Sequence, residues 1–144
     1  MVTSNPYGRA GKSLLSGLNW TADTIKVALL NSSHVTNLDT QEFFADVSAN
    51  EVTGTGYTAG GQALTGKSLG TYDATNNRTP ALAADSAWDA TGGSLAAAFA
   101  VVYKDTGVAA TSPLLAVVDN EGTITATNDL YTIDWNATGG VLAV

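Results

Sequence analysis

Short segments with alternating apolar and polar residues recur along the chain. This pattern predicts β-strands, because successive side chains of a strand point to opposite faces. Two segments show it most clearly, Thr24 to Leu30 and Leu130 to Trp135. Their apolar faces consist of Ile25, Val27 and Leu29 in the first and of Tyr131, Ile133 and Trp135 in the second. Further short strands are expected at residues 62–73, 85–89 and 124–126, and a last apolar stretch runs from Val141 to Val144.

The segment Leu95 to Lys104 is apolar on both faces of the expected strand. One face would hold Leu95, Ala97, Phe99, Val101 and Tyr103, and the other Ala96, Ala98, Ala100 and Val102. The alanines also suit a helix, but the β-branched pair before Tyr103 favours a strand. We therefore predict a central strand that is covered on both sides, and a second one from Pro113 to Asp119.

Helical signals are short and few. Leu14, Leu15 and Leu18 have helical spacing within a possible helix from Arg9 to Leu18, although its glycines weaken that prediction. Asp39 followed three residues later by Glu42 is typical of a helix start. A short helix there would pin Phe43, Phe44 and Val47 to the core.

Glycine and proline separate these elements and indicate the fold class. A Gly-rich connection occupies residues 48–61, and Pro80 predicts an edge strand or a loop. Short, regularly interrupted strands point to an all-β fold, mainly β with one or two short helices, as a single-domain β-sandwich or jelly-roll-like barrel. We expect an N-terminal arm at residues 1–23 and the β domain at residues 24–144.

Composition narrows the classes of function. The chain has no cysteine, which excludes disulfides and thiolate metal sites. Its net charge is −7 with only six Lys and Arg residues, so we expect no nucleic-acid partner. No apolar run is long enough for a membrane-spanning helix. Residues 1–38 carry three bases and one acid, so the arm either contacts an acidic partner surface or shows ordinary scatter of charge.

A phosphate-loop pattern, G-x-x-x-x-G-K-[ST], occurs from Gly61 to Ser68. Phosphate binding by this motif requires a strand before the loop and a helix after it. The residues that follow, Leu69 to Asp73, are a poor helix, so we interpret the segment as a strand between glycine turns.

Other candidate chemistry is equally weak. His34, the only histidine, lies in a polar stretch without a nucleophile pattern, and we expect a solvated loop residue. Asp119 to Gly122 lacks the spacing of an EF-hand loop and is better read as a turn. A glycosidase-like pair among the thirteen carboxylates stays open. We expect no catalytic, cofactor-binding or metal-binding residues, no cofactor and no enzyme activity.

Several strings resemble a family of small structural proteins of tailed bacteriophages. The most specific are Gly-Tyr-Thr-Ala-Gly-Gly at residues 56–61 and Tyr-Lys-Asp-Thr-Gly at residues 103–107. Others are residues 42–47, 51–55, 99–102, 111–116 and 133–137. The similarity runs from about residue 24 to the C-terminus, while the Ala-rich residues 94–98 and the segment Asp119 to Gly122 depart from the pattern.

The resemblance implies a virion component and supplies no catalytic residues. The leading hypothesis is a capsid decoration (cement) protein, a homotrimer that binds the major capsid protein on the outer surface of the phage head. Its location would be the virion, and the host cytoplasm during assembly. The N-terminal arm would contribute Arg9, Lys12, Leu14 and Leu15 to the interface. The alternative is a tail, adaptor or head-fibre module for host attachment.

Overall fold

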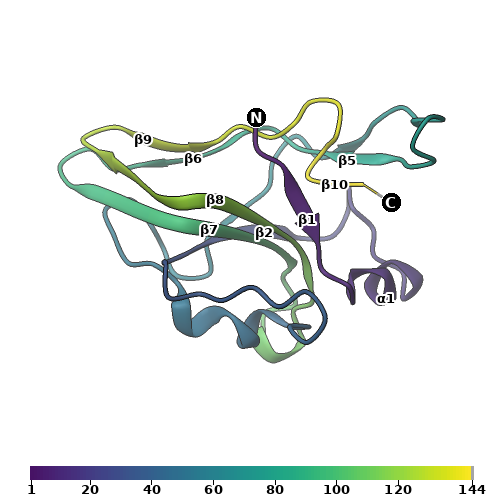
Figure 1. Cartoon of the computed structure of the whole chain (residues 1–144), viewed down its shortest axis with the longest axis horizontal. Coiled ribbons are helices and arrows are strands. Elements are labelled where there is room, and N and C mark those ends of the chain that lie inside the picture. Colours follow the sequence, from purple (N-terminus) through teal and green to yellow (C-terminus); the bar gives the residue numbers. More distant parts are fainter. Residues whose placement is uncertain (144) are drawn as a thin grey trace.

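A five-stranded antiparallel sheet forms the centre of the computed structural model, which describes residues 1–143 (Figure 1). In spatial order its strands are β1 (Ser4–Pro6), β8 (Leu114–Thr127), β7 (Ser94–Lys104), β2 (Ile25–Leu30) and β3 (Gln62–Ala63). The strands predicted at residues 24–30 and 95–104 are confirmed, and the second lies between two neighbours as expected.

Smaller sheets cover one face of this central sheet. A three-stranded sheet has the order β10 (Leu142–Ala143), β5 (Pro80–Leu82) and β4 (Ser68–Leu69), and β6 (Ser86–Asp89) pairs with β9 (Leu130–Ile133). Through residues 1–143 every sheet has open edges and none closes into a barrel. The prediction of a single all-β, sandwich-like domain is confirmed. The C-terminal residue of the predicted last apolar stretch, Val144, lies outside the described residues.

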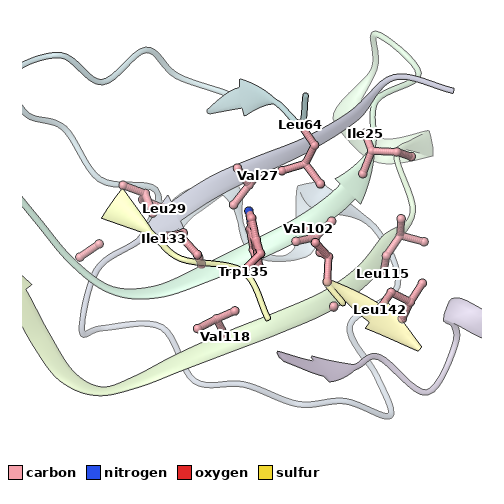
Figure 2. Packing of buried hydrophobic residues seen from close by; sticks show 14 of the residues in the cluster. Ile25, Val27, Leu29, Leu64, Val102, Leu115, Val118, Ile133, Trp135 and Leu142 are labelled. Carbon is pink, nitrogen blue, oxygen red and sulfur yellow. The ribbon is translucent and has the colours of Figure 1, made fainter. Parts of the chain in front are cut away.

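The two faces of the central sheet bury different apolar clusters. We call the one under the smaller sheets the strand-covered core, and Figure 2 shows its side chains from β2 and β7 packed towards Ile133 and Trp135. The opposite, loop-covered core consists of Tyr7, Ala28, Leu30, Phe44, Val47, Val101, Tyr103, Leu114 and Val117. Burying one large apolar side chain contributes about 1.5–3 kcal/mol, so both clusters stabilise the sheet.

The predicted faces of β7 are wrong in one half of the strand. Leu95 and Ala97 lie in the strand-covered core, whereas Val101 and Tyr103 lie in the loop-covered core and Phe99 packs against it. The β7–β8 register shifts between Ala97 and Phe99. Such a bulge reverses the alternation of side chains, which a strict period of two cannot anticipate.

The N-terminal arm is packed into the domain. Strand β1 pairs with residues 116–118 of β8, and Tyr7 and Ala10 are buried. The helix α1 (Ala10–Leu15) is shorter than predicted. Gly17 follows it with a φ of 92°, a left-handed conformation that commonly ends helices.

The helix predicted to start at Asp39 is absent from the described chain. Glu42 O accepts a hydrogen bond from Leu114 N (2.9 Å), and Phe44 N donates one to Ser112 O (2.8 Å). These bonds hold Glu42 and Phe43 beside the start of β8, with Phe43 extended, so the predicted helix cannot begin at Asp39. Only short 3₁₀ segments form, namely η1 (Phe44–Asp46), η2 (Ser48–Asn50) and, later in the chain, η3 (Ala109–Thr111).

Three strand predictions need correction. Residues 62–73 hold two short strands, β3 and β4, because Gly66 turns the chain between them with a φ of 58°. Pro80 begins β5, which is the middle strand of its sheet rather than an edge. The first residue of a strand is one of the positions where a missing N–H is tolerated. Residues 124–126 continue β8 instead of forming a separate strand.

Candidate interaction surface

The predicted interface residues Arg9 and Lys12 lie at the start of α1, and both reach the same carboxylate. Arg9 Nη1 and Lys12 Nζ each lie 2.9 Å from an oxygen of Glu42. The hydrogen bond from Lys12, with the positive charge of both bases, lowers the pKa of Glu42 below its usual range. These two cations therefore tie α1 to the segment before η1, and the single carboxylate offsets one of their two positive charges.

The leucines on α1 face a different environment. Leu14 lines a groove of about 470 Å³ between α1 and the three-stranded sheet. Leu15 projects into solvent with 93% of its surface exposed, and Leu69 on β4 is 63% exposed at the groove. The remaining lining residues are Gly17, Leu18, Asn19, Trp20, Thr79, Ala81 and Leu142. We call this groove together with Leu15 the α1 surface.

Every lysine and arginine has an intramolecular partner in the described chain. Besides the pairs with Glu42, the ion pairs are Lys26–Asp105 (2.6 Å), Lys104–Asp23 (2.8 Å) and Arg78–Asp73 (3.7 Å). Lys67 donates to the backbone carbonyl of Asp23. Hydrogen bonds from Lys104 and Lys26 lower the pKa values of Asp23 and Asp105. This arrangement leaves no cluster of unpaired bases for a phosphate backbone among residues 1–143.

The phosphate-loop pattern does not have the geometry of a nucleotide site. Gly61 precedes β3, Gly66 forms a turn, and Ser68 begins β4, so no helix follows the loop. Lys67 is engaged with the carbonyl of Asp23. The interpretation as strand and glycine turns is confirmed.

His34 is the clearest error of the sequence analysis, because it is buried rather than solvated. Its side chain is 3% exposed and packs edge-to-face on Phe99, with 5.1 Å between the ring centroids. Neither ring nitrogen has a hydrogen-bond partner. Burial lowers the pKa of His34, which favours the neutral ring. The polar residues around His34 give no signal of this burial, because it depends on where the loop crosses the sheet.

The carboxylates do not gather into a metal site. No group of three or more His, Cys, Asp or Glu side chains suited to a metal ion occurs within residues 1–143. Asp119 to Gly122 forms an irregular bulge in β8, with φ values of 56° at Glu121 and 148° at Gly122. The prediction of a turn is wrong here, because the chain stays within strand β8 and bulges instead of reversing direction.

The strings that carried the family resemblance form a structural clamp that the sequence analysis missed. Tyr57 Oη donates to Glu51 Oε1 (2.6 Å) and accepts from Leu29 N (3.0 Å). Tyr103 Oη donates to Gly60 O (2.6 Å). Gly61 has a φ of 70°, and a Cβ there would come within 1.9 Å of Val27 O. The Gly-Tyr-Thr-Ala-Gly-Gly string thus fastens the connection after η2 to the β2–β7 pair, so its residue types follow from folding.

Comparisons with known proteins gave no match. No protein-family model matches the chain, and neither a curated protein nor a solved structure matches it. Among the described residues, no helix has the length and apolar character needed to cross a membrane.

Proposed function

We propose that this chain is a capsid decoration protein of a tailed bacteriophage, which binds the major capsid protein on the outside of the head. The proposal rests on the resemblance of its strings to small phage structural proteins. The structural observation that supports it best is the α1 surface, an uncovered apolar groove beside the fully projecting Leu15. Exposed apolar patches are typical of surfaces that bind other proteins, because burying apolar area against a partner removes it from water.

The mode of binding follows from the charges. The lining of the groove contains no charged side chain, so attachment through the α1 surface would depend mainly on buried apolar area. Such binding is weakly sensitive to salt, since screening acts on exposed charges. Trimers would suit the three-fold positions of a shell, because closed symmetry lets one surface be used repeatedly.

Copy number in purified particles tests this proposal. A decoration protein is expected in hundreds of copies per particle, at a fixed ratio to the major capsid protein measured by quantitative mass spectrometry. A count of about a dozen or fewer would contradict it and favour the tail, adaptor or fibre role, because such parts follow the low symmetry of the tail.

A pair of variants tests the surface itself. Leu15→Ser removes the most exposed apolar side chain of the α1 surface, whereas Val35→Ser removes an exposed one outside the groove. We expect Leu15→Ser to raise the Kd for the shell about tenfold, equivalent to about 1.4 kcal/mol, and Val35→Ser to leave it unchanged. An equal Kd for both variants would show that the α1 surface is not the contact.

A further inference from the structure

Strand β8 leaves one of its edges open near its end. On one side it pairs with β7 throughout Ile124–Thr127, and on the other side β1 covers only Val118, Val117 and Ala116. Residues 124–127 therefore pair with a single strand, β7, within the described chain, although β9 lies close by. Natural edge strands usually carry a lysine, a proline or another protecting device. This stretch, Ile-Thr-Ala-Thr, has none and consists largely of strand-forming residues.

The hydrogen bonds at this end fix which backbone groups face the open side. Ser94 O accepts from Thr55 N (3.0 Å), so the Ser94 carbonyl points away from β8. Its partner Thr127 is therefore in a pair without mutual hydrogen bonds. Because such pairs alternate along an antiparallel ladder, Ala96–Thr125 is another. The N–H and C=O groups of Thr125 and Thr127 consequently point to the free edge.

A groove lies beside this edge. It has a volume of about 480 Å³ and is lined by residues 124–127 of β8 together with Asp129 and the first three residues of β9, Leu130 to Thr132. Ile124 and Leu130 are 51% and 55% exposed there. Figure 1 shows that the β8–β9 turn lies at the end of the molecule opposite α1. The groove is thus distinct from the α1 surface.

Acidic residues stand at both ends of the open edge. Glu121 lies in the bulge before it and Asp129 in the turn after it, and neither forms an ion pair. An antiparallel pairing of two copies centred on Thr125 would bring Glu121 of one near Asp129 of the second copy. Like charges opposed in this way disfavour self-association of a chain with a net charge of −7.

We propose that the β8 edge binds an extended segment of another protein by strand addition, and that this segment has β-branched residues at its centre and Lys or Arg at both ends. Main-chain hydrogen bonds to Thr125 and Thr127 provide the pairing. Alternate side chains of the added strand enter the groove against Ile124. Its terminal bases complement Glu121 and Asp129. This binding is independent of the proposed attachment through the α1 surface.

A peptide titration followed by NMR tests this inference. The probe is the synthetic peptide Lys-Thr-Val-Thr-Val-Thr-Lys, and the control has Glu in place of both Lys residues. We expect saturable shifts at the amides of Thr125 and Thr127, slower hydrogen exchange at both, and at least about tenfold weaker binding of the control peptide. Absence of binding, shifts confined to other strands, or equal binding of both peptides would overturn the proposal.

A matched pair of variants separates strand addition from other binding. Thr125→Pro removes the outward N–H, which lies outside the β7–β8 ladder, and places a ring at the open edge, whereas Thr125→Val retains the N–H. We expect the proline variant to lose binding by at least about tenfold and the valine variant to keep it, with unfolding transitions confirming that both are folded. Equal binding by the two variants would refute the pairing.

Reversing both acidic charges provides a second test of the binding site, which applies even if the proline variant fails to fold. The variant Glu121→Lys with Asp129→Lys should bind the acid-ended peptide better than the base-ended one. An unchanged preference for the base-ended peptide would contradict the assigned site. Self-association that disappears in Thr125→Pro, measured by sedimentation, would also overturn it, because the occupant would then be a second copy.

Discussion

Apolar side chains are buried on both faces of the central sheet, but the two faces are covered by different kinds of structure. On one face, β6 and β9 contribute Trp88 and Ile133, the segment after β9 contributes Trp135, and the indole of Trp135 donates to Ser86 Oγ (3.1 Å). On the other face, loops and 3₁₀ segments provide the cover and leave buried polar atoms without partners. These atoms are Tyr7 Oη, both His34 ring nitrogens and Thr36 Oγ1.

The comparison of the two faces shows why covering a sheet with loops stabilises it less than covering it with strands. When strands cover a sheet, their backbone N–H and C=O groups are hydrogen-bonded to neighbouring strands. Their side chains alternate between the two faces at every second residue. A loop must satisfy its backbone locally, and its side chains are buried wherever the chain happens to cross the sheet. An unpartnered buried polar group costs about 1–3 kcal/mol, so the loop-covered face should be the less stable and more adaptable side.

The largest effect compares adjacent leucines of β2 that point to opposite faces. Leu29 is fully buried in the strand-covered core and Leu30 in the loop-covered core. We expect Leu29→Ala to lower the free energy of unfolding by about 4 kcal/mol and Leu30→Ala by about 2–3 kcal/mol, because loops relax into a cavity more readily. Chemical denaturation measures both, and a larger loss for Leu30→Ala would reverse the comparison.

Acid should weaken the loop-covered face first. Because burial lowers the pKa of His34, the folded protein binds fewer protons than the unfolded chain below the ordinary value of 6.5. The contribution of His34 is therefore fully present above that pH and is lost as the pH falls from 6.5 towards the lowered folded pKa. His34→Leu should make the free energy of unfolding less dependent on pH just below 6.5, as measured by denaturation at each pH. An identical slope in the variant would contradict the assignment.

Removing a tyrosine hydroxyl should change the stability of the fold in opposite directions on the two faces. Tyr7→Phe removes an unpartnered hydroxyl from the loop-covered core and should stabilise the fold by about 1 kcal/mol. Tyr131→Phe removes an acceptor of Asn120 Nδ2 (3.0 Å) on the other face and should destabilise it by about 1 kcal/mol. Thermal unfolding of both variants checks the prediction, which fails if Tyr7→Phe destabilises as Tyr131→Phe does.

The smallest effect on stability is expected outside both cores. Leu15→Ser changes an almost fully exposed side chain, so the free energy of unfolding should stay within about 0.5 kcal/mol of the parent. A larger loss would show that Leu15 supports the fold and would disqualify the variant as a test of binding.

Strands with strict alternation, such as β2 and β9, were predictable because one face of each is buried and the period of two is preserved. The faces of β7 were not, since the bulge near Ala97 depends on pairing with distant residues of β8. The failed helix at Asp39 has a similar cause, because tertiary bonds from Ser112 and Leu114 override a local start signal. His34 was misplaced because burial of a loop is a property of the whole fold.

The candidate surfaces also contain some features that the sequence predicts and others that only the structure shows. Leu14 and Leu15 could be proposed from helical spacing and a family resemblance, but the pairing of Arg9 and Lys12 with Glu42 required the structure. The open edge at Thr125 had no signal in the sequence, because an unpaired edge is defined by the strand that is missing beside it.

Co-sedimentation of the purified protein with expanded phage heads that lack it tests the central claim most directly. We expect saturable binding at hundreds of copies per shell, little affected by salt, with a Kd that Leu15→Ser raises about tenfold. No binding to such heads, with the protein found instead at low copy in intact particles, would contradict it.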